Sequence, residues 1–177
     1  MKIRILALIV IVGFSFGCKK LQELTQFEMA FDESVNVPSS LGINIPLDIP
    51  TPDITTNSDA TFSGQNTSKD LINKISLKTM QLSLATPVNG DLSFLKSIEI
   101  QISANNLPDV KVAWKTDVPS NVGKTLILDA SDADIKEYIK GDKFHLKVKV
   151  TTRKVIATEQ KIDIHSVFFV DAKVLGI

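Results

Sequence analysis

The sequence predicts an all-β protein, an antiparallel β-sandwich of immunoglobulin-like architecture with two short helical insertions. From Phe27 onward, apolar and polar residues alternate in short runs, which is the pattern of strands that bury one face. Residues that favour turns separate these runs, and the helical stretches between them are too few for a parallel sheet. The chain has one cysteine, so the disulfide of true immunoglobulin domains is excluded and the likeness is one of architecture. An up-and-down barrel is the alternative fold.

The chain begins with the layout of an export signal. Lys2 and Arg4 give a positive start, and an apolar run over residues 5–17 leads to the single cysteine, Cys18. The run is shorter than the ~20 apolar residues that a helix needs to cross a bilayer core. We therefore interpret the segment as a signal peptide rather than a permanent membrane span.

Gly17 and Cys18 resemble the lipobox of bacterial lipoproteins, in which small residues precede a cysteine that becomes lipid-modified and N-terminal. Ser15 and Phe16 depart from the usual aliphatic-then-small pair, and this looser form is similar to lipoproteins of the Bacteroidetes type. The resemblance implies that Cys18 is acylated and anchors the protein to a membrane. An ordinary cleaved signal also fits Ser15 and Gly17, but it would leave a lone thiol at the N-terminus.

The resemblance also implies the domain organisation and the location of the protein. A signal peptide over residues 1–17 is removed, Cys18 and a tether follow over residues 18–26, and one β-sandwich domain occupies residues 27–177. Lys19, rather than an aspartate, follows the cysteine, which is similar to lipoproteins that are sorted to the outer membrane. We expect an exported, lipid-anchored protein of the cell envelope that faces the periplasm, and display on the cell surface stays open.

Charge and composition exclude nucleic acid as a partner. The sequence has 20 basic and 20 acidic side chains, and two of the basic ones, Lys2 and Arg4, lie in the signal. No basic stripe with interleaved aromatic residues is present, so nothing in the sequence favours binding to nucleic-acid phosphates. The predicted partners are the membrane, through the lipid on Cys18, and an envelope protein or an apolar ligand.

The first predicted strand covers residues 27–37, with its odd-numbered residues mostly apolar. Apolar residues continue at odd-numbered positions through the next stretch, in which every proline is at an even-numbered position. We interpret this stretch as an edge strand or arm available to a partner, with its odd side chains buried and its even edge blocked by prolines. An irregular proline-rich loop is the alternative. The apolar residues of the stretch are Leu41, Ile43, Ile45, Leu47 and Ile49.

A polar outer strand is predicted over residues 54–62, followed by one or two helical turns over residues 66–74. In the strand that begins at Ile75, apolar residues change from odd to even positions, which predicts a β-bulge near residues 78–80. A second short helix is expected over residues 131–140. Further alternating runs, which predict the remaining strands, cover residues 98–102, 110–114, 125–129, 144–150 and 162–170.

No catalytic, cofactor-binding or metal-binding residue is predicted. His145 and His165 each stand alone on a strand, and neither is expected to ligate a metal or to catalyse a reaction. Asp163 lies two residues before His165, so a surface hydrogen bond between the two side chains is expected.

The densest acidic cluster comprises Asp129, Asp132 and Asp134. A calcium loop needs a glycine at its sixth position, and Asp134 stands there instead. Ser131 with Asp134 three residues later fits a capping box, and acids near a helix N-terminus are favoured. We therefore interpret the cluster as helix capping.

These observations favour a non-enzymatic cell-envelope lipoprotein, a lipid-anchored β-sandwich with a binding or structural role. Binding of carbohydrate through aromatic stacking is disfavoured, because Trp114 shares its parity with Val110 and Val112 and is therefore expected in the core. The alternative function is the binding or carriage of a lipid or another apolar small molecule, for which the excess of aliphatic alternation is the support.

Replacing Cys18 with Ala is expected to block lipid labelling and to release most of the protein from membranes, or to leave it unprocessed. Two or three acyl chains hold a protein stably on a bilayer, and the variant has none. Metabolic labelling with a fatty-acid analogue, followed by separation of membranes from soluble material, measures both effects. Normal membrane retention of a wild-type protein that carries no lipid would contradict the anchor.

Overall fold

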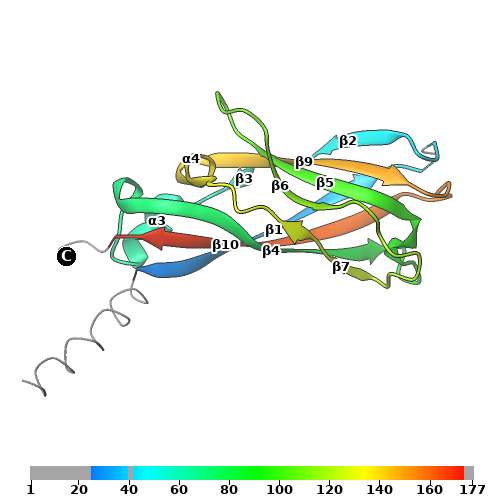
Figure 1. Ribbon diagram of the computed structural model, residues 1–177, viewed down its shortest axis with the longest axis horizontal. Helices are drawn as coiled ribbons and strands as arrows, with labels where there is room; N and C mark the ends of the chain where they lie inside the picture. Colours follow the sequence, from blue (N-terminus) through cyan, green and yellow to red (C-terminus); the bar gives the residue numbers. More distant parts are fainter. Residues whose placement is uncertain (1–24, 40–41, 174–177) are drawn as a thin grey trace, which may run out of the picture.

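The computed structural model describes residues 25–39 and 42–173. The strands form two antiparallel sheets packed face to face (Figure 1). The first sheet has the order β1 (Gln26–Val37), β10 (Gln160–Ala172), β4 (Ile72–Thr86), β7 (Thr125–Ile127). The second has the order β2 (Pro46–Pro50), β9 (Lys143–Thr152), β5 (Leu95–Ser103), β6 (Val110–Lys115), β8 (Asp129–Ala130), and β3 (Ile54–Thr55) also pairs with β9. The predicted antiparallel β-sandwich is confirmed, and the division into two sheets excludes the alternative fold.

The alternation in the sequence places one face of each long strand in the core. Along β9, Phe144, Leu146, Val148 and Val150 are at most 1% exposed, while His145 and two lysines lie between them on the outside. Burying a side chain of this size stabilises the fold by about 1.5–3 kcal/mol relative to leaving it in water. The outward face of the second sheet is consequently polar along this strand.

Three phenylalanines join the two sheets inside the core. Phe31 on β1 and Phe168 on β10 belong to the first sheet, and Phe144 on β9 belongs to the second. The ring centroids are 5.3 Å apart for Phe31 and Phe144, 5.7 Å for Phe31 and Phe168, and 6.2 Å for Phe144 and Phe168, all edge to face. Aromatic pairs in this geometry contribute about 0.5–1.5 kcal/mol each beyond the area that they bury. The cluster therefore fixes how the two inner faces meet.

Strand β4 contains the predicted bulge. In the pairing with β10, Leu77 lies opposite Phe168 and Thr79 lies opposite Val167, so Lys78 has no partner. The extra residue changes the parity of the strand, and Leu77 and Met80 are therefore both buried. The prediction of a bulge near residues 78–80 is confirmed.

The predicted polar strand over residues 54–62 is wrong beyond its first two residues. After β3 the chain forms a helix, α3 (Ser58–Gly64). Asn57 adopts a left-handed backbone conformation, with φ 49°, which ends an extended strand and which asparagine tolerates well. Phe62, expected on a strand, is fully buried from the helix.

The other short helical segments are smaller than predicted. The turns expected over residues 66–74 consist of one 3₁₀ turn, η1 (Lys69–Leu71), that leads into β4. The helix expected over residues 131–140 forms in its second half, as α4 (Lys136–Lys140). A further 3₁₀ turn, η2 (Leu92–Phe94), precedes β5.

The strand register separates the two ends of the sandwich (Figure 1). Gln26, at the start of β1, pairs with Asp171 near the end of β10, and α3 lies at this end. Val37, at the other end of β1, pairs with Gln160, the first residue of β10. The chain that precedes β1 therefore joins the domain at the α3 end, and the β9–β10 loop lies at the opposite end.

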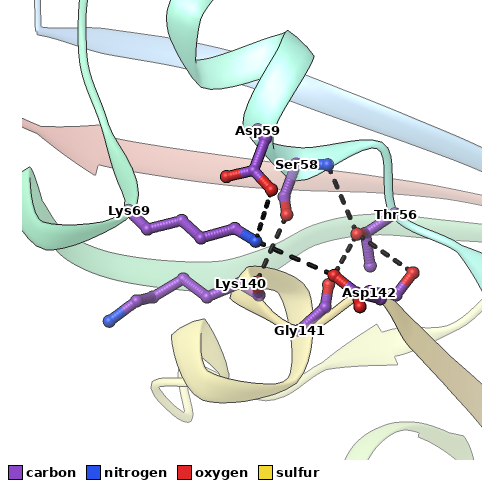
Figure 2. A network of polar contacts seen from close by, with 7 residues as sticks. All are labelled: Thr56, Ser58, Asp59, Lys69, Lys140, Gly141 and Asp142. Atoms are coloured by element: carbon purple, nitrogen blue, oxygen red, sulfur yellow. Dashed lines mark hydrogen bonds and ion pairs between the residues drawn. The ribbon is translucent and has the colours of Figure 1, made fainter.

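Polar contacts fasten α3 to the turn between α4 and β9 (Figure 2). The Thr56 hydroxyl donates to the carbonyl oxygen of Gly141 at 2.6 Å, and the Ser58 hydroxyl donates to that of Lys140 at 3.3 Å. Thr56 and Ser58 are 3% and 2% exposed. Because the two hydroxyls themselves are buried, losing one of these contacts leaves a polar group without its partner in the protein.

An ion-pair group surrounds the same junction on the outside (Figure 2). Lys69 Nζ lies 2.8 Å from Asp59 Oδ2 and 3.9 Å from Asp142 Oδ1. Both carboxylates are largely exposed, and exposed pairs of this kind contribute about 0–1 kcal/mol. The buried hydroxyls therefore stabilise the junction more than the ion pairs do.

Replacing Thr56 with Val is expected to lower the free energy of unfolding by about 1–3 kcal/mol. Valine fills the same space but leaves the Gly141 carbonyl and the Ser58 N–H, which donates to Thr56 Oγ1 at 3.3 Å, without this partner. Urea unfolding measures the change. Thr55→Val, at the exposed neighbour on β3, is the control and is expected to change stability by less than about 0.5 kcal/mol. An equal loss in both variants would contradict the role of the buried hydroxyl.

Candidate functional site

Trp114 lies on the outer face of the second sheet, and its predicted place in the core is wrong. In the pairing of β6 with β5 the register shifts by one residue, and Val112 has no partner. Val112 and Ala113 are both buried although they are adjacent, so the next side chain, that of Trp114, turns outward. Trp114 is half-buried and does not pack in the core cluster.

A hollow of about 200 Å³ opens beside the Trp114 ring on this outer face. It crosses four neighbouring strands, from β2 at the edge of the sheet through β9 and β5 to β6. Pro46 forms its boundary at the sheet edge, and Lys149 and Glu99 lie between that proline and Trp114. The hollow therefore combines an aromatic ring with charged groups on a flat sheet surface.

Charged side chains hold the ring from one side. Lys111 Nζ lies 4.9 Å from the centroid of the Trp114 ring, a cation–π contact. The same ammonium lies 4.0 Å from Glu99 Oε2, while Gln101 Nε2 donates to Glu99 Oε1 at 2.8 Å. An ammonium group thus lies over the ring, and a carboxylate lies beside that ammonium.

Three hydroxyl groups around the hollow are free to bind a ligand. They belong to Ser97, Thr116 and Thr151, and within residues 25–39 and 42–173 none of them has a hydrogen-bond partner in the protein. The C–H face of a sugar packs against an aromatic ring, while its hydroxyls exchange hydrogen bonds with side-chain hydroxyls and carboxylates. A few polar groups converging beside an aromatic wall are typical of a small-molecule site.

Neither histidine joins this hollow. His165 Nδ1 lies 2.6 Å from Asp32 Oδ1 on the neighbouring β1. The sequence predicted a hydrogen bond from His165 to Asp163, and that prediction is wrong. His145 Nδ1 is 3.9 Å from Asp53 Oδ1, which is too long for a hydrogen bond. Among the residues that the structure describes, no three metal-ligating side chains are grouped so as to hold an ion.

The acidic cluster does not converge on one point. Asp129 and Asp132 form ion pairs with lysines of β6 and β4. Asp134 accepts hydrogen bonds from backbone N–H groups and also forms an ion pair with Lys136, at 3.1 Å. The three carboxylates therefore have separate structural partners.

The predicted capping box is wrong in its detail. Ser131 Oγ accepts from the N–H of Ala133 at 3.1 Å, outside the helix. Asp134 Oδ1 accepts from the N–H of Lys136, the first residue of α4, at 3.1 Å and from that of Ile75 on β4 at 3.2 Å. Asp134, one residue before the N-cap Ile135, thus binds the first N–H of α4 and fastens this end of the helix to the first sheet.

The proline-punctuated stretch forms an edge strand over Pro46–Pro50 alone. β2 lies at the edge of the second sheet, and the N–H of Thr51 donates to Leu146 O on β9 at 2.8 Å. Since alternate residues face alternate edges, the odd N–H groups face β9 and the prolines face away. Leu47 and Ile49 are half-buried against the core, as the edge-strand interpretation requires.

The first part of that stretch differs from its prediction. Ile43 and Ile45 are 47% and 63% exposed, so the expectation that they are buried is wrong. Asn44 between them has φ 63°, a left-handed conformation that interrupts an extended strand. Leu41 lies outside the described residues, and a partner at this stretch stays a prediction.

Cys18, the predicted acylation site, also lies outside the described residues. Its lipidation therefore stays a prediction. In the described part of the chain, every helix falls short of the length and apolar character that a bilayer crossing requires.

No protein-family model matches the sequence, and no curated protein is similar to it. Several solved structures are distantly similar in shape. The capsid of Helicobacter pylori bacteriophage KHP30 has 8% identity and a TM-score of 0.34, over 81% of this chain and 92% of that chain. The Triatoma virus empty capsid has 10% identity and a TM-score of 0.37, over 87% and 94%. A carbohydrate-binding module of the β-sandwich superfamily has 12% identity and a TM-score of 0.32, over 88% and 58%. Similarities of this degree support no conclusion about function.

Replacing Asp134 with Ala is expected to lower the free energy of unfolding by about 1 kcal/mol near pH 7, as loss of a helix cap does. Burial raises the pKa of Asp134, but hydrogen bonds from the N–H groups of Ile75 and Lys136, together with the ammonium group of Lys136, outweigh it, so the pKa lies below its ordinary value. The loss is therefore complete above the unfolded-state pKa of about 3.9 and disappears as the pH falls through the lower folded-state pKa.

Urea unfolding of both proteins at neutral and acidic pH measures this difference. Asp132→Ala is the control, because its side chain is 88% exposed, and it is expected to leave stability almost unchanged. A loss that is the same at every pH would contradict the role assigned to the charged form of Asp134.

Proposed function

We propose that this chain is a lipid-anchored, non-enzymatic β-sandwich of the cell envelope that binds a glycan at the hollow beside Trp114. The positive start, the apolar run and the cysteine that ends it support the export and the anchor. The ring, the charged pair and the free hydroxyls on an open sheet face support the binding of sugars.

The outward position of Trp114 is the observation on which the proposal rests. Burying an aromatic side chain would stabilise the fold by about 1.5–3 kcal/mol, and a ring on the outer face gives up part of that stabilisation. Without the extra residue at Val112, the parity of β6 would point Trp114 into the core. A bulge that moves the chain's one tryptophan to the surface is typical of a site that re-aims a side chain toward a ligand.

The shape of the hollow suits a chain of sugars rather than one enclosed ring. Its four strands are spaced ~4.8 Å apart, so the surface between Pro46 and Trp114 extends ~14 Å. One sugar stacks on Trp114, displacing the Lys111 ammonium from the ring or sharing it. The next sugar lies over β5 and β9, where the hydroxyls of Ser97 and Thr151 bind it.

The alternative function, carriage of an apolar molecule, has no comparable support. Side chains of the described residues fill the space between the sheets, and Phe62, Phe94, Phe144 and Phe168 are each at most 2% exposed there. Close packing of this kind leaves little room for a lipid in the core.

Replacing Trp114 with Ala is expected to weaken glycan binding about 30-fold, because a central aromatic anchor contributes ~2 kcal/mol to binding. Trp114 is the only tryptophan in the sequence, so its fluorescence reports binding directly in the wild type. Titration of a panel of soluble oligosaccharides of defined linkage identifies a ligand, and calorimetry compares the variants. Trp114→Phe is expected to retain most of the affinity.

Ile127→Ala is the matched control, because Ile127 is an exposed apolar residue on the first sheet and should leave the affinity unchanged. The proposal fails if no oligosaccharide alters the tryptophan emission and immobilised glycans retain the wild type and Trp114→Ala equally.

A further inference from the structure

Exposed apolar side chains gather at one end of the sandwich. Among the described residues, five large apolar side chains are exposed, and four of them lie on loops at the end opposite α3. They are Ile43 (47% exposed), Ile45 (63%), Val88 (69%) and Val155 (60%), and the fifth is Ile127 on β7. Single exposed apolar residues are ordinary on a protein surface, but a gathering on neighbouring loops indicates an interaction site.

Hydrogen bonds join these loops into one surface, which we call the loop tip. The N–H of Arg153 donates to Phe94 O at 2.9 Å, and the N–H of Leu92 donates to Gly123 O at 3.0 Å. The loop tip comprises residues 42–45, 87–96, 117–124 and 153–159. It lies at the far end of the sandwich from the start of β1 (Figure 1).

The turn that displays Ile43 and Ile45 is held in place from within the fold. The N–H of Asn44 donates to Thr152 O on β9 at 2.9 Å. The Asn44 side chain accepts from Lys96 Nζ at 2.7 Å. The exposed isoleucines therefore flank an anchored asparagine rather than a loose loop.

The lysines of the described loop tip form no close ion pairs, although the charge of Lys154 acts on the nearby carboxylate of Asp91. Lys96, Lys124 and Lys154 donate to a side-chain amide oxygen, a backbone carbonyl and a hydroxyl. In the described part of the chain, none of these ammonium groups lies within 4.0 Å of a carboxylate oxygen. Most other lysines of the sandwich form such pairs.

Basic side chains also slightly outnumber acidic ones on this surface, although the whole sequence has 20 of each. The basic residues of the loop tip are Lys96, Lys124, Arg153 and Lys154, and the acidic ones are Asp91, Asp117 and Glu159. The guanidinium of Arg153 donates to the backbone carbonyls of Leu95 and Val118, so the three lysines are the donors left for a partner. An anionic partner therefore finds donors whose charge is still available.

We propose that the loop tip docks on the headgroup layer of a bilayer that contains anionic phospholipids. Its aliphatic side chains enter the boundary between headgroups and acyl chains, while its lysines meet the phosphates. Protein interfaces instead favour aromatic residues in a continuous packed centre. The exposed large apolar residues of the described loop tip are isoleucine and valine on separate loops, which suits a fluid surface.

The loop tip docks on the bilayer opposite the one in which the protein is anchored. This step rests on the proposed anchor at Cys18. β1 has 12 residues, so ~40 Å separates its start from the loop tip at ~3.3 Å per residue. The chain between Cys18 and β1, residues 19–25, reaches at most ~25 Å. Because the tether is shorter than the domain, the loop tip does not reach its own bilayer head-on.

A two-vesicle capture experiment tests the proposal. The full-length protein is reconstituted into phosphatidylcholine vesicles and mixed with fluorescent vesicles that contain or lack phosphatidylglycerol. We expect the wild type to capture the phosphatidylglycerol vesicles alone. Ile45→Ser combined with Val155→Ser should reduce capture about tenfold or more. Ile127→Ser is the matched control, and Trp114→Ala should also leave capture unchanged, which separates this surface from the proposed glycan site.

The proposal is overturned if the double variant captures as many vesicles as the wild type does. It is also overturned if the wild type captures neutral and anionic vesicles equally. The proposal is also overturned if the wild type captures no vesicles but self-associates in solution, and the double variant does not self-associate. The partner of the loop tip would then be a second copy of the chain. If circular dichroism shows that the double variant is unfolded, Lys96→Gln with Lys154→Gln replaces it, and undiminished capture by that variant overturns the proposal. A further outcome is that the protein dissociates from the phosphatidylcholine vesicles while it stays bound to the phosphatidylglycerol vesicles. That result supports the docking of the loop tip and contradicts only the proposed anchor at Cys18.

Discussion

The edge-to-face packing of Phe31, Phe144 and Phe168 is the interaction on which the rest of the structure depends. It joins strands β1 and β10 of one sheet to β9 of the other. Loss of one such ring from a core costs about 3–5 kcal/mol, a large part of the stability of a domain this size. Because side chains alternate along a strand, fixing these rings inside also fixes which residues of the three strands face outward. The outer faces, where ligands bind, are thus set by the core.

Two bulges modify that alternation with opposite consequences. At Lys78 the extra residue returns Met80 to the core, so the bulge keeps the interior filled. At Val112 the extra residue turns Trp114 outward and places Lys111 on the same face, three residues away, where it stacks on the ring. A flat strand would put residues three apart on opposite faces. The cation–π pair beside the hollow therefore exists because of the bulge.

The strands were predictable because burial of one face repeats every two residues, a local property of the sequence. The parity change between Leu77 and Met80 marked the first bulge for the same reason. The second bulge was missed because Ala113 is small enough to occur on either face, so its burial leaves no clear signal. α3 was missed because alternation does not encode the left-handed backbone of Asn57. The partner of His165 depends on the register of β1 against β10, which pairs residues far apart in the chain.

The segment of residues 43–50 connects the two surfaces that we assign to partners. Pro46 and Pro50 remove N–H donors from the outer edge of β2, so this edge resists the addition of a strand, and side chains have to provide the binding. Pro46 lines the Trp114 hollow, and Ile45, the residue directly before it, projects from the loop tip. Any displacement of Pro46 by a ligand therefore acts on the position of Ile45. By thermodynamic linkage, if a ligand in the hollow changes the affinity of the loop tip for its partner, that partner changes the affinity of the hollow for its ligand by the same factor.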